Sequence, residues 1–591
     1  MKKQEYEKRV ESSTATLTNL TATANMVGYV KLIGIFVMGV ALYFLFSRSY
    51  PVPIIITTIA LAIILVALWI YHSMLSEKIS HVRNIISINK RQLARISGSW
   101  VNFPDTGAEF ISGEHPYSSD LDIVGQKSFF QYINTTHTWH GRRAFANDLL
   151  QPQYSNSELV GRQEAILELS KDIDLSSELE HCFSKIGKQA SAEKLVSALS
   201  KQEGFVSSKA LRVFLLYMPL VSFVFIVAVT LFRLDGLYIA AVTVAAVQAV
   251  VWIIGISKTH SYVQGISGLP YKLRAYSNVL HIIQSAGFIS TQLKQLIADI
   301  STPSAAQAIK DLDKIAAKVS IRHNAIIWVI ANILLLWDYE CAFKFEQWRL
   351  KYAHMANKWF STLGTFESLL CFSHLPNVCN NTCVPTIENR KIIEAQGMGH
   401  PLIGNNVRVN NTVSINDSIF IVSGSNMSGK TTFMRTVGIN LVLARAGSYV
   451  CAKEMSFFPL ELITSMRIAD DLSEGISTFY AELKRVKSIV SLAEKTPNML
   501  FLIDEIFRGT NSVDRLSGAK AVLTRINTCN AMGIITTHDL ELCEIDRLFP
   551  RIKNYGFSEQ YKDGQILFDY LLKPGKSITT NAKFLMQMVG I

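Results

Sequence analysis

The chain has 591 residues, enough for several domains, and carries a formal net charge of +11 at pH 7. Only 18% of its residues are charged, the mean hydropathy is +0.23 and the apolar residues form long runs, which argues against a purely soluble protein and points to membrane segments. The eight cysteines show no paired framework, which fits a reducing cytosol. The positive charge has two explanations, lysines close to a membrane and contacts with nucleic acid, and composition does not separate them.

The N-terminal part of the chain predicts a transmembrane hairpin. Residues 1–26 are polar and are expected to form a cytoplasmic N-terminal segment. Residues 27–46 and 52–71 are runs of 20 residues each, apolar except for Lys31 near the start of the first, and long enough to cross a hydrocarbon core of about 30 Å, so we expect a hairpin at 27–71. Two spans in tandem without a cleavage site disfavour a signal peptide, and the apolar length disfavours the alternative of buried core helices.

Charges on either side of this hairpin predict its orientation. The linker between the two runs carries only Arg48. Because positively charged flanks stay in the cytoplasm, both ends of the hairpin are expected on the cytoplasmic side. Five basic residues follow the second run: Lys78, Arg83, Lys90, Arg91 and Arg95.

A second pair of uncharged runs, at 213–232 and 236–256, predicts a second hairpin at 213–256. Basic residues flank its outer ends, so it is expected to have the same orientation as the first. Pro219 should kink its first helix, which membrane helices tolerate. Because no charged side chain lies in the middle of the four spans, they are predicted to be anchors rather than an ion pathway.

The segments 72–203 and 257–370 are predicted to be soluble, and the second of them helical. Within it, the run 325–337 is apolar apart from Asn332 and too short to span a membrane, so it is expected to be a buried core helix. The basic residues of this arm have two readings, a solvated helix face, which is the default, and a DNA contact. They are Lys310, Lys314, Lys318, Arg322, Lys344, Arg349, Lys351 and Lys358.

Cys371, His374, Cys379 and Cys383 form a candidate metal site, because cysteine and histidine are zinc ligands. Three residues separate the second pair, whereas paired ligands in knuckle-like turns usually have two residues between them. No zinc is therefore expected, and these residues are interpreted as the entrance to the last domain, 371–591.

A phosphate-binding loop is the most specific signal in the chain. An apolar run at 418–423, typical of a buried strand, leads into Gly424-Ser-Asn-Met-Ser-Gly429-Lys430-Thr431 and then into a helix. The glycines allow the backbone to curl around phosphates and to aim its N–H groups at them. Lys430 is expected to reach the β- and γ-phosphates, and the Thr431 hydroxyl to bind Mg²⁺.

Two further apolar strands end in residues that suit phosphate chemistry. Residues 499–503 end at Asp504 and Glu505, and residues 533–537 lead to His538. Asp504 is predicted to complete the Mg²⁺ shell and Glu505 to polarise the attacking water, while His538 senses or contacts the γ-phosphate. Together the three strands predict an enzyme that binds ATP and Mg²⁺ and hydrolyses the ATP.

Four separated motifs follow one another in a specific order. They are His-Pro-Leu-Ile at 400–403, the loop at 424–431, the stretch 467–482 with its Ser-Thr-Phe sequence, and Asp-Glu-Ile-Phe-Arg-Gly-Thr at 504–510. This combination resembles the MutS family of DNA mismatch-repair ATPases.

The resemblance extends over residues 120–200 and 265–591. Leu516-Ser-Gly-Ala-Lys is similar to the LSGGQ motif of ABC transporters, but it follows the Asp-Glu strand instead of preceding it. Phe507 stands where the MutS family usually has glycine, and Ser425 and Ser428 where it usually has proline and glycine. These departures remove neither a metal ligand, nor the base, nor the lysine, so hydrolysis is expected to survive.

The resemblance implies an α/β P-loop ATPase domain of the ABC type at 371–591 and an all-α MutS-like core and lever region at 72–203 and 257–370, beside four transmembrane helices in two hairpins. It also implies a homodimer in which Ser477 contacts the γ-phosphate held by the other subunit. It adds five residues to the nucleotide site formed by the loop: His400, Asn426, Met427, Thr432 and Tyr570.

Two features of the MutS family are missing from this sequence. No Phe-x-Glu wedge precedes Asp120, and the second hairpin stands where a DNA-gripping clamp interrupts the core helices in the family. We expect a multi-pass protein of the cytoplasmic (inner) membrane with its ATPase domain in the cytoplasm, which uses ATP to act on double-stranded or branched DNA or in DNA repair. The alternative is an ATP-driven membrane switch or transporter-like assembly factor that does not bind DNA.

Overall fold

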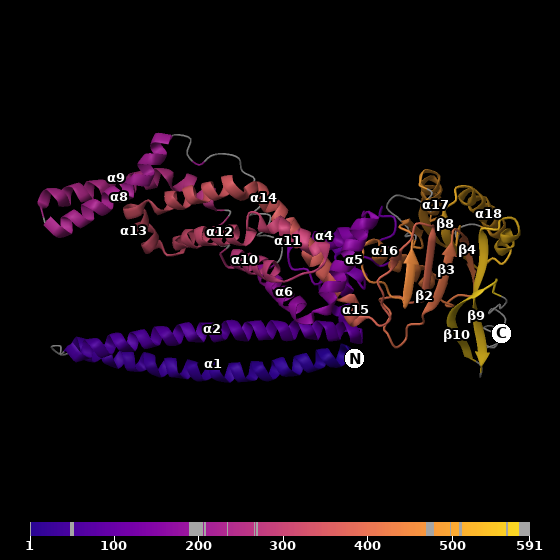
Figure 1. The fold of residues 1–591 in the computed structure, drawn as a ribbon, viewed down its shortest axis with the longest axis horizontal. Coiled ribbons are helices and arrows are strands. Elements are labelled where there is room, and N and C mark those ends of the chain that lie inside the picture. Colours follow the sequence, from indigo (N-terminus) through magenta and orange to yellow (C-terminus); the bar gives the residue numbers. More distant parts are fainter. Residues whose placement is uncertain are drawn as a thin grey trace.

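Helices and sheets occupy opposite ends of an elongated molecule (Figure 1). The computed structural model describes residues 2–47, 52–187, 205, 209–232, 234–264, 266, 270–467, 478–496, 498–507, 511–562 and 565–577. Two helical hairpins extend toward one end, and the β-sheets lie at the other. The long axis therefore separates the predicted membrane segments from the predicted nucleotide site.

The first hairpin is longer than the sequence predicts. α1 (Lys2–Ser47) and α2 (Val52–Ser97) have 46 residues each and pack against each other. The polar segment predicted at 1–26 is not separate, because from Lys2 onward it forms the first half of α1. Threonine hydroxyls there, such as those of Thr14 and Thr18, donate to carbonyl oxygens one turn earlier, which satisfies these polar groups within the helix.

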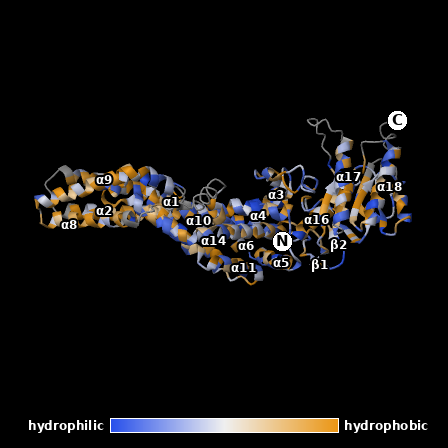
Figure 2. Cartoon of the chain, turned by 90° about the horizontal axis from the view of Figure 1, so that it is seen from above, coloured by the Kyte–Doolittle hydropathy of each residue, from blue (hydrophilic) through white to orange (hydrophobic). Residues whose placement is uncertain are grey.

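Four helices of the described residues are long and apolar enough to cross a membrane: α1, α2, α8 (Lys209–Phe232) and α9 (Asp235–Val263). Their outward side chains include Phe36, Trp69 and Ile254, which are 73%, 71% and 79% exposed. Figure 1 shows the two hairpins turning at the same end of the molecule, and Figure 2 shows hydrophobic residues over both. The helices predicted as two hairpins are therefore present.

A helical core connects the hairpins to the sheets. Its longest member, α14 (Trp337–Ser373), runs from the second hairpin to the sheet-containing end (Figure 1). The other α-helices of this part are α3 (Phe129–Ile133), α4 (Trp139–Leu150), α5 (Asn156–Lys171), α6 (Ile173–Ile186), α10 (Pro270–Ser285), α11 (Thr291–Ser301), α12 (Ala305–Val319), α13 (Ala325–Leu335) and α15 (Leu375–Val378), with 3₁₀ turns η1 (Ser99–Asn102), η2 (Ala108–Phe110) and η3 (Ser320–His323).

One prediction about this core is wrong. The apolar run 325–337 was expected to be a buried helix, but α13 exposes Ile326, Ile327 and Ile330 at 74%, 53% and 52%. Asn332, the single polar residue of α13, is the buried one. The reason is position: α13 packs against α8, α9 and the start of α14 at the base of the second hairpin, so only one of its sides is covered by protein.

Gly141 of α4 and Gly364 of α14 allow these two helices to approach closely, and this gives a first testable prediction. A Cβ added at Gly364 would lie 2.7 Å from the backbone carbonyl carbon of His140, where no side chain can move aside. We expect Gly364→Ala to lower the free energy of unfolding by about 1–3 kcal/mol through overpacking. The measurement is thermal unfolding of the full-length protein in nanodiscs.

Gly161 in α5 provides the matched control for this substitution. A Cβ there would lie 3.4 Å from Gln292 Oε1, the end of a flexible side chain. Gly161→Ala is therefore expected to leave stability unchanged or to raise it by up to about 1 kcal/mol, because alanine favours the helix. Equal unfolding curves for the two variants would contradict the prediction, because they would mean that α4 and α14 can move apart enough to accommodate the added methyl group.

The sheets form an α/β domain. Strands β1 (Thr386–Ile387), β2 (Ile392–Met398), β3 (Asn411–Asn416) and β5 (Glu454–Phe457) form a four-stranded sheet in the order β1-β5-β2-β3. Strands β4 (Ile419–Ser423), β6 (Glu461–Ser465), β7 (Met499–Asp504), β8 (Met532–Thr537), β9 (Ile552–Lys562) and β10 (Gln565–Pro574) form a six-stranded sheet in the order β10-β9-β4-β8-β7-β6. All neighbours in the larger sheet are parallel except β9 and β10.

Helices cover both faces of the larger sheet. They are α16 (Lys430–Arg445), α17 (Thr478–Lys495), α18 (Ser512–Thr528) and the 3₁₀ turn η4 (Leu542–Arg547). Alternate side chains of β4 enter different cores: Phe420 and Val422 pack in one, Ile419 and Ile421 in the other. A parallel strand buried on both faces reads as a continuous apolar run, which is why the sequence predicted it.

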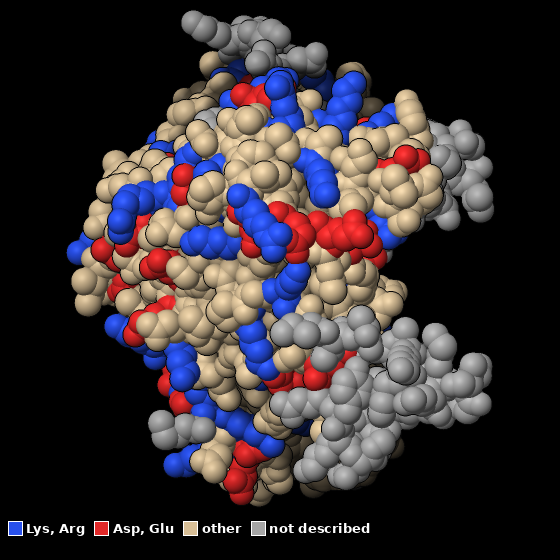
Figure 3. All heavy atoms as spheres, turned by 90° about the vertical axis from the view of Figure 1, so that its right-hand side faces the viewer, with Lys and Arg blue, Asp and Glu red and all other residues tan. Residues whose placement is uncertain are grey.

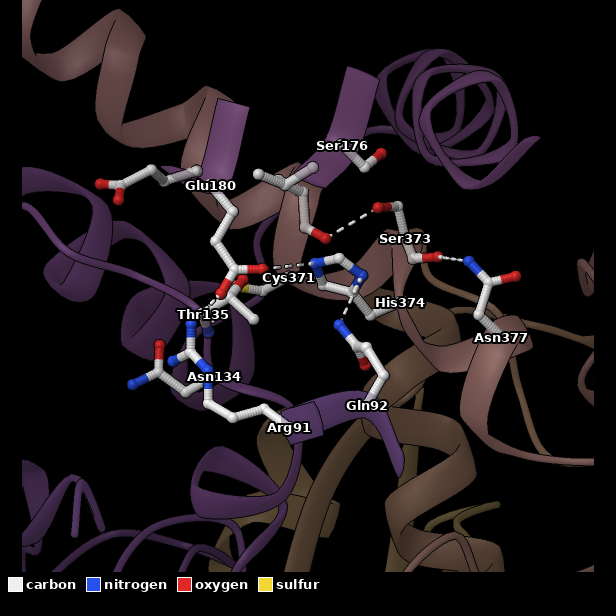
Figure 4. Close-up of polar contacts among 12 residues, drawn as sticks. Arg91, Gln92, Asn134, Thr135, Ser176, Glu180, Cys371, Ser373, His374 and Asn377 are labelled. Carbon is white, nitrogen blue, oxygen red and sulfur yellow. Dashed lines mark hydrogen bonds and ion pairs between the residues drawn. The ribbon is translucent and has the colours of Figure 1, made fainter. Parts of the chain in front are cut away.

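Three of the four candidate zinc ligands have separate partners at the entrance to this domain. Cys371 Sγ accepts from the Thr135 N–H at 3.3 Å, and Cys379 Sγ lies 3.0 Å from Cys451 Sγ. His374 lies 3.3 Å from Gln92 and 3.8 Å from Glu180, as Figure 4 shows. Within the described part of the chain, no group of three or more histidine, cysteine, aspartate or glutamate residues could hold a metal ion.

Candidate nucleotide site

The predicted phosphate-binding loop joins β4 to α16. Gly429 has a φ of +102°, and a Cβ there would lie 3.1 Å from the Tyr570 ring, so alanine would be strained at this position. α16 begins at Lys430, and no side chain caps its first turn. The N–H groups of that turn are therefore available to an anion, and the positive end of the helix dipole adds to the attraction.

The side chain of Lys430 folds back into the phosphate-binding loop. Its buried ammonium donates to the carbonyl oxygens of Gly424 and Ser425, both at 2.8 Å, and lies 3.4 Å from His538 Nε2. The ammonium thus lies within the curled backbone, a position from which it can neutralise phosphates.

Asp504 joins two threonines at the carboxyl edge of the sheet. Its Oδ2 accepts from Thr431 Oγ1 at 2.9 Å, and its Oδ1 accepts from Thr536 Oγ1 at 2.6 Å. Hydroxyl and carboxylate oxygens are the ligands that Mg²⁺ prefers, so Thr431 and Asp504 fit the metal role predicted for them. The strand order places β8 between β4 and β7, so Thr536 fills the gap between the loop and Asp504.

Glu505 and His538 lie beside this cluster. Glu505 Oε1 is 2.5 Å from His538 Nε2, and the Glu505 N–H donates to Thr536 Oγ1 at 3.1 Å. Glu505 has a φ of +54°, an uncommon conformation for a residue with a side chain, and its side chain lines the nucleotide pocket. The carboxylate can therefore accept a proton from a water bound next to the loop.

The loop opens into a pocket of about 460 Å³. Most of the residues predicted from the sequence line it: His400, Asn426, Met427, Gly429, Lys430, Thr431, Thr432, Glu505 and Tyr570. Gly424, Asp504 and His538 are held against these residues by the contacts above, whereas Ser477 lies outside the described residues. A volume of several hundred Å³ suits a nucleotide.

His400, which lies outside the loop in sequence, also lines the pocket. Burial lowers the pKa of its imidazole to about 4, so near pH 7 the ring is neutral. The Leu402 N–H donates to His400 Nδ1 at 3.3 Å. A neutral ring held by the backbone suits contact with a base better than contact with a phosphate.

Comparison with known proteins shows which proteins this part of the chain is similar to. Residues 420–588, from β4 to near the C-terminus, match the family model described as MutS domain V. The DNA mismatch repair protein MutS of Chloroflexus aurantiacus is 30% identical over 208 residues, which are 34% of this chain and 21% of that protein. The C-terminal domain belongs to the MutS family.

Two further relatives match a similar part of this chain. The DNA mismatch repair protein MutS of Staphylococcus epidermidis is 29% identical over 247 residues, 40% of this chain and 28% of that protein. That of Staphylococcus aureus is 30% identical over 238 residues, 38% of this chain and 26% of that protein. The chain thus spans between 21% and 28% of the length of these relatives.

Several functional contacts of the MutS-family domain escaped the sequence analysis. Ser425, one of the departures from the family pattern, donates its hydroxyl to the buried Glu559 of β9, and Asn411 Nδ2 donates to the Tyr570 carbonyl oxygen at 3.0 Å. Thr536 stands two residues before His538. The two polar residues Thr536 and Thr537 at the end of an apolar strand could have indicated from the sequence that Thr536 belongs to the site. Ser425 and Asn411 have partners more than 100 residues away, and no local pattern signals such contacts.

Two aspartates tie the helical part to the MutS-family domain. Asp120 accepts from the N–H groups of Met466 and Arg467, at 3.1 and 2.9 Å. Asp122 accepts from Arg435 of α16 at 3.0 Å and from Arg467 at 2.6 Å. The segment around Asp120 therefore contacts both the helix that follows the phosphate-binding loop and the strand end that leads toward α17.

Charges of both signs cover the end of the molecule that carries the MutS-family domain. Figure 3 shows lysine and arginine alternating with aspartate and glutamate over this face. Within this domain, Arg515 and Asp539 form a bidentate pair, at 2.8 and 3.1 Å.

Proposed function

We propose that this protein is a membrane-anchored MutS-family ATPase that binds ATP and Mg²⁺ and hydrolyses the ATP. The observation that carries the proposal is the convergence of Lys430, Thr431, Asp504 and Glu505 on one pocket. The phosphates would lie in the loop with Lys430, and Mg²⁺ on Thr431 and Asp504. Glu505 would accept a proton from the attacking water, positioned by His538.

The active unit would be a homodimer with composite sites. Ser477 precedes α17 directly and would reach the γ-phosphate bound by the other subunit. Exposed apolar side chains at the pocket support a protein partner there: Met427 and Val407 line the pocket and are 86% and 75% exposed. ATP bound between two subunits would hold the dimer closed, and hydrolysis would reopen it.

The two hairpins would anchor the ATPase at the cytoplasmic (inner) membrane, with residues 27–71 and 213–256 in the bilayer. Residues 72–203 and 257–370 would form the core and lever, and 371–591 the ATPase domain, on the cytoplasmic side of the membrane. The four apolar helices support this topology, because their exposed apolar surface suits acyl chains better than water.

A buried polar cluster would couple the first hairpin to the ATPase domain. Arg91 of α2 pairs with Glu180 of α6, which faces His374 at the end of α14 (Figure 4). Burial is the largest single effect and alone would raise the pKa of Glu180, but Arg91, His137 and His374 together outweigh it and lower the pKa to about 2, so the carboxylate is ionised. Because a buried charge must keep its partner, α2 and α6 would move together.

DNA is the first candidate substrate, because the relatives are named DNA mismatch repair proteins. One observation favours the alternative, a membrane switch or transporter-like factor without DNA. Basic side chains of the helical arm are paired with carboxylates: Lys314 with Asp311, Lys318 and Lys344 with Glu340, Arg322 with Asp338, and Lys358 with Asp299. Paired charges release fewer counterions on binding phosphates than free ones do.

The ATPase rate in nanodiscs, with and without duplex, branched and single-stranded DNA, tests this choice. For a DNA-directed enzyme we expect stimulation that falls steeply as salt is raised from about 50 to 200 mM. Robust basal turnover that no DNA changes would reject the DNA function and favour the membrane switch. Absence of turnover under every condition would reject the ATPase itself.

A further inference from the structure

Helix α13 lacks a polar face. Between Ala325 and Leu335 its single polar residue is Asn332, which is buried, and it contains no charged residue. The exposed side chains Ile326, Ile327 and Ile330 lie within about one turn of each other and are 74%, 53% and 52% exposed. A helix that is apolar on all sides lies in a protein core or in a membrane, and the free side of α13 is not covered by the described residues.

The path of the chain suits a helix that enters and leaves on one side of a bilayer. The helical stretch Ala305–His323 and α13 meet at an angle of 115°. At the other end Leu336, with a φ of +47°, turns the chain into α14. The 11 residues of α13 span about 16 Å, roughly half of a hydrocarbon core.

Polar contacts to Asp338 lie where the apolar surface of α13 ends. Asp338 accepts from the Trp328 indole at 3.0 Å, from Arg322 Nε at 2.9 Å and from the Trp252 indole at 3.4 Å. The two indoles meet edge to face at 5.1 Å. Tryptophans with the ring in apolar surroundings and the N–H on a polar partner are typical of the membrane interface.

The free face of α13 adjoins the apolar surface of the second hairpin. Trp328 contacts Trp252 of α9, and the α9 residues that follow, Ile253 and Ile254, are 62% and 79% exposed. α13 also packs on α8. A bilayer around α8 and α9 would therefore reach α13, whereas water against α13 would leave a contiguous apolar patch exposed beside the hairpin.

We propose that α13 is a fifth membrane-embedded element, an interfacial helix that lies in the cytoplasmic leaflet beside α8 and α9. Lipid covers the exposed face of this helix. Ile326, Ile327 and Ile330 contact acyl chains, and the pair of Asp338 and Arg322 lies at the boundary with water. The proposal rests on the proposed anchoring of the second hairpin. It explains why a run too short to span a membrane is nevertheless apolar throughout.

Lipid-borne quenchers test this placement in the full-length protein. Bimane is attached to Ile330→Cys, and the protein is reconstituted in nanodiscs with and without doxyl-labelled phospholipid. Ile254→Cys in α9 reports the span, and Ile289→Cys, which is 79% exposed between α10 and α11, is the matched isoleucine outside the bilayer. The parent protein, treated identically, gives the background from the native cysteines.

We expect doxyl lipid to reduce bimane emission at 330 and 254 roughly twofold or more, because an interfacial helix lies about 5–10 Å deep. Emission at 289 should respond to aqueous iodide instead. A label at 330 that behaves like the one at 289, or that neither quencher reaches because protein covers it, would overturn the proposal for α13. If the label at 254 also fails to respond to lipid, the proposed membrane anchoring itself is wrong, so the two failures are distinguishable.

Discussion

Glu505→Gln is expected to bind ATP as the parent protein does and to hydrolyse it about 10²–10³-fold more slowly. Glutamine keeps the size of the side chain but cannot accept the proton of the attacking water. The contacts of Lys430 and of Asp504 with Thr431 do not involve Glu505, so nucleotide and Mg²⁺ binding should remain. The measurements are the steady-state ATPase rate and the amount of labelled ATP retained after gel filtration.

Glu541→Gln is the control for the Glu505 experiment, because Glu541 is an exposed glutamate just before η4, outside the residues that line the pocket. It should hydrolyse ATP at the parent rate. If nucleotide closes the dimer, Glu505→Gln should also accumulate as a dimer in ATP. A Glu505→Gln protein that turns over like the parent would reject Glu505 as the base, and His538, 2.5 Å from it, would become the candidate.

The chemistry of the nucleotide site was predictable because it resides in short contiguous motifs. The loop from Gly424 to Thr431 and the strand ends at Asp504 and His538 each combine a buried strand with polar residues at its carboxyl end. Such combinations are local, so a single sequence carries them. The order of the strands is not local: β8 lies between β4 and β7, and Thr536 consequently bonds Asp504.

The errors in the helical part also have physical causes. Composition marks α13 as apolar, but burial depends on what packs against a helix, and its neighbours α8, α9 and α14 cover one side. The sequence marks Arg91 as one of the basic residues that flank the first hairpin, and the structure adds that it pairs with the buried Glu180. Glu180 lies 89 positions away in sequence, and a charge pattern along the chain does not reveal such a partner.

Lys430→Ala and Ser477→Ala should each abolish most ATPase activity as pure proteins, yet a mixture of the two should regain it. Lys430 acts within its own subunit, where it lies at the centre of the loop. Ser477, which lies outside the described residues, is proposed to act on the nucleotide of the other subunit. In a mixed dimer the Ser477→Ala subunit keeps Lys430 and receives Ser477 from its partner, so one of the two composite sites is intact.

The amount of recovered activity distinguishes shared sites from separate ones. With random pairing of equal amounts, half of the dimers are mixed and each has one complete site, so the expected rate is roughly a quarter of that of the parent. Lys430→Ala mixed with Glu505→Gln is the control, because both residues act within their own subunit and no complete site can form. Recovery in both mixtures, or in neither, would contradict composite sites, since only a residue supplied across the dimer restores a site whose own lysine, metal ligand and base are intact.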